Sequence, residues 1–91
     1  MSSAIDFADG SSKDRVLGIV NDILARRSPG RSIRTDEDLR EAGLNSLDMV
    51  NLMLAVEAEF DLKIPDTDMT LRNFRSISAI DALVSSLLRG A

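Results

Sequence analysis

Apolar residues recur at helical spacing in three separate stretches of the chain. This periodicity predicts amphipathic helices over residues 12–27, 46–59 and 76–89. The positions that form the apolar stripes are, in chain order, Val16, Leu17, Val20, Ile23 and Leu24, then Leu47, Val50, Leu54 and Phe60, then Ile77, Ile80, Val84 and Leu87. Because an apolar stripe faces the core of a globular protein, we expect this side of the second helix to pack against the core and Leu54 to be buried.

Local signals mark where each predicted helix starts and stops. Ser12 is a suitable N-cap for the first helix, and Ser28-Pro29-Gly30 ends it. Pro65 closes the second helical segment, because proline disfavours helix at the residue before it. Asp66 or Thr67 can cap a short further helix that runs to about residue 74, and Gly90 ends the last helix.

The first connection, residues 28–45, is long for so small a protein. Ile33 and Leu39 are isolated apolar positions within it, and residues 35–38, Thr-Asp-Glu-Asp, can open a short helical turn. A loop of this length is uncommon in a compact domain and is often functional. No repeat or strand alternation is visible, so the pattern predicts an all-α fold. We expect a four-helix bundle of three principal helices and one short helix, with a long first loop.

Length and composition fit a single small domain of 91 residues. Residues 1–12 are mostly small and polar, which predicts a disordered N-terminal tail and leaves residues 13–91 as the domain. Phe7, Phe60 and Phe74 are the only aromatic residues. The core is therefore expected to be aliphatic, which suits packed helices better than a β-sandwich.

The chain contains no cysteine and no histidine. Disulfides, thiolate metal sites and a cysteine nucleophile are therefore excluded, and the usual group for general acid–base catalysis is missing. The acidic residues are spread along helices and do not form a ligand-spaced loop, so no metal site is expected. These observations predict a protein that is not an enzyme.

No export signal or membrane-spanning segment is visible in the sequence. The N-terminus lacks a basic stretch followed by an apolar run, and no apolar run approaches the ~20 residues that a membrane helix needs. A small domain without disulfides suits a reducing compartment. We therefore expect a cytoplasmic protein that does not insert into membranes.

The charges are segregated along the chain, whose net charge is -4. Five arginines lie between residues 26 and 40, whereas residues 41–68 hold seven acidic residues against a single Lys63. The acidic half contains the predicted 46–59 helix, and it would attract basic partners and repel nucleic-acid phosphates. The arginine cluster has no aromatic interleaving and no groove-reading motif, so we expect no nucleic-acid partner.

A serine stands at the predicted start of the second helix, after a short loop that contains Gly43. Asn45 and Ser46 are both common N-cap residues, and Asp48 would lie in the first turn, so the residues alone indicate capping. The same place suits a covalently attached phosphate, because free backbone N–H groups and the positive end of the helix dipole lie beside the hydroxyl. Ser46 is thus either a helix cap or an attachment point.

The residues around this serine resemble the acyl carrier protein family. The match is Glu-Ala-Gly-Leu-Asn-Ser-Leu-Asp-Met-Val over residues 41–50 and Leu-Ala-Val-Glu-Ala-Glu-Phe-Asp-Leu-Lys-Ile-Pro-Asp over residues 54–66. The resemblance covers most of residues 13–89 and implies the family's four-helix fold. It also implies that Ser46 carries phosphopantetheine, moved from coenzyme A by a phosphopantetheinyl transferase. The thiol of that arm would hold an acyl group as a thioester.

A second similarity concerns the cargo. Residues 74–80, Phe-Arg-Ser-Ile-Ser-Ala-Ile, look like the corresponding stretch of small freestanding aminoacyl carrier proteins, which ligases load with an amino acid. Peptidyl carrier domains and specialised acyl carriers remain alternatives. Asn45 replaces the aspartate that most members carry before the serine, and Asn51 and Ala58 occupy positions that are commonly acidic in fatty-acid carriers. The alternative function is an unmodified interaction module that keeps the carrier fold.

The expected partners are the transferase, an acyl- or aminoacyl-loading ligase and the enzymes that use the cargo. The residues expected to form the partner interface lie close to Ser46 or on the same acidic helix: Leu44, Asn45, Leu47, Asp48, Met49, Val50 and Glu57. Met49, Met53 and Met69 either line a cargo pocket or fill the core, since methionine adapts to both. A monomer is expected, because a carrier visits several enzymes in turn.

Overall fold

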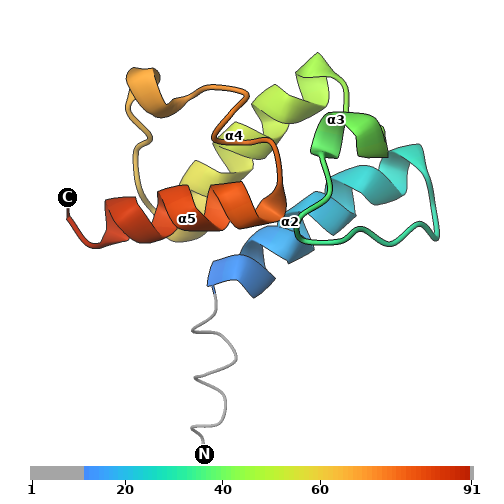
Figure 1. The fold of residues 1–91 in the computed structure, drawn as a ribbon, viewed down its shortest axis with the longest axis horizontal. Coiled ribbons are helices and arrows are strands. Elements are labelled where there is room, and N and C mark those ends of the chain that lie inside the picture. The colour runs from blue at the N-terminus through green and yellow to red at the C-terminus, as the bar shows by residue number, and fades with distance from the viewer. Residues whose placement is uncertain (1–11, 91) are drawn as a thin grey trace, which may run out of the picture.

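The computed structural model describes residues 12–90, which form a bundle of helices with no strand among them (Figure 1). In chain order the elements are α2 (Ser12–Arg27), α3 (Leu39–Ala42), α4 (Ser46–Phe60), the 3₁₀ helix η1 (Asp66–Asp68) and α5 (Ile77–Leu88). The predicted all-α fold and the three principal helices are confirmed. The predicted N-terminal tail lies outside the described residues, apart from Ser12, which begins α2.

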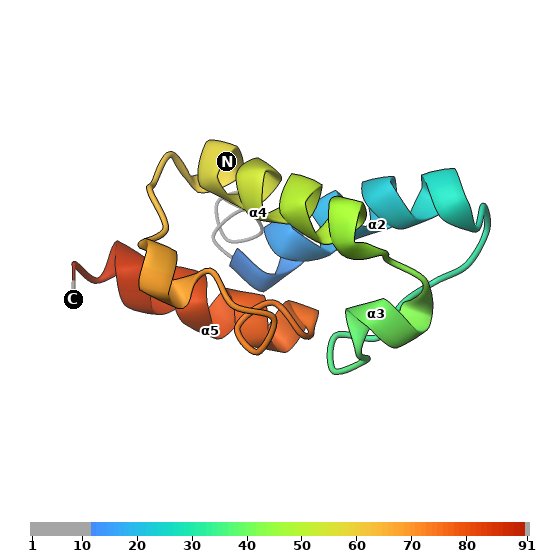
Figure 2. The ribbon, with the colours of Figure 1, turned by 90° about the horizontal axis from the view of Figure 1, so that it is seen from above.

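The helix α2 packs against both α4 and α5 and is the central element of the bundle (Figures 1 and 2). Arg15, near its start, pairs with Glu59 at the end of α4, and Arg27, at its end, pairs with Asp48 at the start of α4. These two pairs show that α2 and α4 are antiparallel. The Arg15 guanidinium also lies 4.5 Å from the centroid of the Phe60 ring, so it covers the core where α4 ends.

The core is aliphatic, as the composition predicts, with Phe60 and Phe74 as its aromatic members. The stripes of α2 and α5 supply it as expected: Val16, Val20, Ile23, Leu24, Ile77, Ile80 and Val84 are all buried. Outside the three principal helices, Leu39, Leu44 and Ile64 are buried as well and anchor the segments between these helices to the same core. Burial of this surface is the main stabilising contribution in so small a fold.

The buried face of α4 differs from the predicted one. Leu47, Val50 and Leu54 are 65%, 50% and 56% exposed, and the side chains that enter the core are Met49, Leu52, Val56 and Phe60. Both sets have helical spacing, but they are offset by two residues, and residues two apart on a helix point in nearly opposite directions. Of the four positions in the predicted stripe, only Phe60 is buried.

The long first connection is interrupted by α3. Asp38 is its N-cap and accepts hydrogen bonds from the backbone N–H groups of Arg40 and Glu41 (2.9 and 3.2 Å). The predicted helical turn at residues 35–38 is thus a non-helical turn that leads into α3. Leu39 is buried, and its N–H donates to the carbonyl of Arg75 at 2.8 Å, which ties this connection to the segment before α5.

The short helix predicted to run to residue 74 is wrong in its extent. Only η1 is helical, and residues 70–76 form successive turns (the orange segment of Figure 1). Side chains take over the backbone hydrogen bonds here: the Thr70 hydroxyl accepts from the N–H of Asn73, and the Asn73 amide donates to the carbonyl of Asp68. Such local bonds compete with the helical pattern.

Candidate functional site

The candidate serine lies at the junction between α3 and α4. Gly43 ends α3 with φ 122°, a conformation that favours glycine, and its N–H donates to the carbonyl of Arg40. The buried Leu44 then anchors the link, and Ser46 is the first residue of α4, with its side chain at the surface. The short, anchored link fixes where the serine stands.

Asn45, and not Ser46, is the cap of α4. The Asn45 side-chain oxygen accepts from the N–H of Asp48 at 2.8 Å, and the Asp48 carboxylate accepts from the N–H of Asn45 at 3.0 Å. This reciprocal pair is a capping box. Within residues 12–90 the Ser46 hydroxyl makes no hydrogen bond, so capping does not use it.

The start of α4 is also joined to the end of α2 by an ion pair. The Nε and Nη2 atoms of Arg27 donate to the two carboxylate oxygens of Asp48 at 2.8 and 3.2 Å. The hydrogen bonds from Arg27 hold the pKa of Asp48 below its usual value, and the bond from the Asn45 backbone N–H adds to this effect. Burial of the carboxylate acts in the opposite direction but is outweighed. The negative charge nearest to the serine is therefore paired.

The residues present fit a phosphodiester on Ser46. The hydroxyl is exposed and unengaged, and the backbone N–H groups of Ser46 and Leu47 stand in the first turn, where a helix leaves N–H groups without partners. A phosphate there would meet the positive end of the α4 dipole. The one carboxylate of this turn, Asp48, is neutralised by Arg27 and would repel the phosphate only weakly.

Residues 14–80 match the family model described as "Phosphopantetheine attachment site". The chain belongs to this family. It is therefore a carrier protein that holds acyl or aminoacyl groups on a phosphopantetheine prosthetic group. The resemblance found in the sequence is thereby confirmed.

The carrier protein is similar to several named relatives. It is 38% identical over 79 residues to aminoacyl carrier protein 1 of Bradyrhizobium diazoefficiens, covering 87% of this chain and 88% of the relative. It is 37% identical over 75 residues to the aminoacyl carrier protein of Agrobacterium fabrum, covering 78% and 90% of the two chains. The aminoacyl carrier subgroup suggested by residues 74–80 is thus confirmed as the group that this chain resembles.

Solved structures support the same relationship. One is the crystal structure of a Bradyrhizobium japonicum glycine:[carrier protein] ligase with its cognate carrier protein and an analogue of glycyl adenylate. The matched chain is 38% identical, with a TM-score of 0.69, over 81% of this chain and 96% of that one. A second structure holds the ligase with the glycylated carrier protein, at a TM-score of 0.67 and coverage of 78% and 96%.

The structure divides the predicted partner interface into three groups. Leu44 and Met49 are 2% exposed and belong to the core, so they offer little surface to a partner. Asp48 is buried and paired with Arg27, and the Glu57 carboxylate accepts from the N–H of Ile64 at 2.7 Å. The carrier protein exposes the others: Asn45, Leu47 and Val50.

One surface residue was missed because it was assigned to the core. Leu54 lies on the same side of α4 as Leu47 and Val50, at positions i, i+3 and i+7, and all three are at least half exposed. We call these three residues the α4 apolar patch. Their spacing was visible in the sequence, but the sequence did not show which side of α4 faced the core.

Two further expectations concern metals and membranes. Among the described residues, no group of three or more acidic side chains is placed to hold a metal ion. No helix in the same part of the chain is long and apolar enough to cross a membrane.

Met53 and Met69 pack against the core from partly buried positions, so of their two predicted roles the structure shows core packing.

The paired state of Asp48 makes a prediction about stability and pH. Asp48→Asn should lower the free energy of unfolding at pH 7 by about 1–3 kcal/mol, because it removes the charge that Arg27 meets. The pKa of Asp48 is lowered in the folded state, so its contribution is present above its unfolded pKa of about 3.9 and is lost as pH falls through the folded pKa. The difference between the two proteins should therefore shrink below about pH 4.

Urea unfolding of both proteins between pH 3 and pH 7 measures this difference. Asp36→Asn is the matched control, since Asp36 pairs with Arg34 in a bridge whose side chains are both largely exposed. A constant difference across the pH range would contradict the role of the ionised carboxylate.

Proposed function

We propose that Ser46 is the attachment point of phosphopantetheine and that the cargo is an amino acid. The observation that carries the first part is the exposed Ser46 hydroxyl, left unengaged at the start of α4 by a capping box that uses its two neighbours, Asn45 and Asp48. The second part rests on the names of the relatives, which are aminoacyl carrier proteins.

Attachment is a group transfer in which Ser46 Oγ is the acceptor. The oxygen forms a bond to the phosphorus of the phosphopantetheine group of coenzyme A, the adenosine bisphosphate leaves, and the hydroxyl proton is released to the transferase. The protein contributes position: Gly43 and the capping box orient the hydroxyl outward, and the first-turn N–H groups favour the phosphate charge. Once attached, the group supplies the thiol that this cysteine-free chain lacks.

The loading partner is a carrier protein ligase of the kind in the related complexes, which contain a glycine:[carrier protein] ligase. The α4 apolar patch, Leu47, Val50 and Leu54, begins next to Ser46 and is the surface that we assign to this contact. Apolar residues gathered in one exposed patch mark interaction sites more often than single exposed ones. Catalysis then belongs to the partners, and the carrier works in the cytoplasm, where coenzyme A and amino acids are available.

Asn45 does not argue for an unmodified module. Its side chain supplies the cap that aspartate would supply, and it lacks only the charge. An incoming phosphate therefore meets one negative charge fewer beside Ser46, which does not oppose modification.

The proposal is tested by intact mass spectrometry in two steps. The full chain is incubated with coenzyme A, Mg²⁺ and a broad-specificity transferase, and a gain of one phosphopantetheine is expected. Protein isolated from its native source, with thioesters preserved, should carry a further amino-acid mass that hydroxylamine removes.

Each step has an outcome that contradicts one part of the proposal. An unchanged mass with several transferases would count against attachment. A fatty-acyl mass on the native protein would retain the attachment but reject the amino-acid cargo.

A further inference from the structure

A small apolar groove of about 200 Å³ opens between α3, the first half of α4 and residues 71–75. Met49 and Phe74 contribute its buried lining, and Leu71, 53% exposed, stands at its surface. Four charged residues also line it: Asp38, Arg40, Arg72 and Arg75. The groove therefore combines an exposed leucine with three exposed arginines.

These three arginines differ from most others in the described part of the chain. Arg15, Arg27, Arg31 and Arg34 each form an ion pair with a carboxylate. Within residues 12–90, none of the three groove arginines, Arg40, Arg72 and Arg75, forms an ion pair with a carboxylate. Three guanidinium groups without an ion pair therefore line one groove in a chain of net charge -4.

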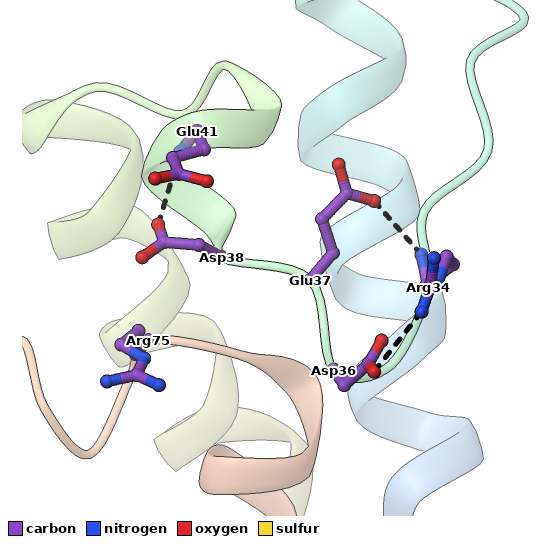
Figure 3. Close-up of a pocket in the computed structure, with 6 residues that line it drawn as sticks. All are labelled: Arg34, Asp36, Glu37, Asp38, Glu41 and Arg75. Carbon is purple, nitrogen blue, oxygen red and sulfur yellow. Dashed lines mark hydrogen bonds and ion pairs between the residues drawn. The ribbon is translucent and has the colours of Figure 1, made fainter.

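Among the described residues, one acid lines the groove, and it does not pair with these arginines. The Asp38 carboxylate accepts from the backbone N–H groups of Arg40 and Glu41 and forms no ion pair with the three arginines. Figure 3 shows Arg75 below Asp38, with no interaction joining the two side chains.

The larger pocket drawn in Figure 3, about 420 Å³, differs in this respect. Its Arg34 pairs with Asp36, and Glu37 accepts from the Arg34 backbone and from Arg31. The charges of Arg34, Asp36 and Glu37 in this pocket are therefore satisfied within the chain.

The groove is formed by ordered backbone. The N–H of Phe74 donates to the carbonyls of Thr70 and Leu71, which holds the turn that presents Leu71. The carbonyl of Arg75 accepts from the N–H of Leu39, which holds this segment beside α3. A ligand would thus meet a surface that is already arranged, which lowers the ordering cost of binding.

We propose that this groove docks an acidic segment of a partner protein. An apolar side chain of the segment enters the groove beside Leu71, and its carboxylates meet Arg40, Arg72 and Arg75. Guanidinium groups bind carboxylates with two parallel hydrogen bonds, and complementary charge sets orientation and speeds association. A protein segment fits better than a small free anion, because the arginines surround an apolar surface that only a partner with an apolar side chain would fill.

The position of the groove relates it to the serine. Met49 lines the groove and stands three residues after Ser46, about one helical turn along α4. A partner that reaches Ser46 can therefore touch the groove with an acidic segment. The proposal does not depend on modification of Ser46.

The test is an NMR titration of the ¹⁵N-labelled full chain with a short blocked peptide of alternating glutamate and leucine. Saturable shifts are expected at the amides of residues 40, 49 and 71–75. The same peptide with lysine in place of glutamate should not produce them. Arg72→Glu should raise the apparent Kd for the peptide by about threefold or more. This is the effect expected when an exposed ion pair is lost and the charge is reversed.

Arg26→Glu is the matched control. Arg26 is exposed on α2, has no ion pair within the described residues and does not line the groove. Both variants replace an arginine by a glutamate, so they change the net charge equally. Equal weakening by the two variants would show an effect of net charge only and overturn the proposal. Inorganic phosphate that saturates the same amides and displaces the peptide would indicate a small-anion site instead. Absence of any saturable shift would also overturn it.

Arg72 and Arg26 are both exposed, so neither substitution should disturb the fold. The amide spectrum of each variant checks this. Ser46→Ala protein should bind the peptide as the wild type does. Failure of the attachment proposal would therefore leave this result unaffected, and the reverse holds as well.

Discussion

Ser46→Ala is expected to abolish the gain of phosphopantetheine completely while leaving the fold intact. The alanine lacks the only oxygen that the proposed attachment uses. The free energy of unfolding should change by less than about 0.5 kcal/mol, because the Ser46 hydroxyl makes no hydrogen bond within residues 12–90 and alanine is a good helix former. Intact mass after the transferase reaction and urea unfolding at pH 7 measure the two quantities.

Ser76→Ala should show the opposite behaviour and is the matched control. Ser76 is the N-cap of α5, and its hydroxyl accepts from the N–H of Ala79 at 3.1 Å. Its loss should cost about 1 kcal/mol of stability and leave phosphopantetheine transfer unchanged. The two serines thus separate attachment from capping. Transfer to Ser46→Ala protein would place the attachment at another residue.

Phe74→Ala is expected to have the largest effect on stability, a loss of about 3–5 kcal/mol. Phe74 is fully buried and is the largest of the fully buried side chains. It stands among turns, where Phe74 and the partly buried Met69 pack the segment between η1 and α5 against the core. A small domain has only about 5–15 kcal/mol of stability, and a substantial fraction of the protein should unfold at 37 °C.

Urea and thermal unfolding followed by circular dichroism measure this loss. Leu71→Ala is the matched control in the same turn, since Leu71 is more than half exposed and should lose less than about 1 kcal/mol. A similar loss for both variants would show that the turn, and not the buried ring, carries the stability. Removal of the ring should also disrupt the groove that Phe74 lines.

The arrangement around Ser46 depends on both local chemistry and tertiary contacts. From the sequence, Asn45, Ser46 and Asp48 all suit a helix start, and capping alone accounted for them. The structure shows that Asn45 and Asp48 cap each other, which leaves Ser46 unused. Arg27 lies 21 residues before Asp48 in the chain, so its part in holding this turn could not be read from the local pattern.

The sequence by itself determined the helices α2 and α5, the start of α4 at Ser46 and the position of the candidate serine. These features depend on local causes: apolar periodicity of one clear phase, side chains that cap, and breakers such as Pro29 and Pro65. Each of them acts within a few residues, so each is visible in the chain.

Only the tertiary structure decided which side of α4 is buried and what residues 69–76 do. The helix α4 carries two apolar stripes, and packing against α2 selected Met49, Leu52 and Val56, which left Leu47, Val50 and Leu54 exposed. The turn at residues 70–76 is held by buried Phe74 and by the bond from Leu39 to Arg75, both of which are long-range. Periodicity identifies an apolar face, but the neighbouring helices determine whether it is core or interface.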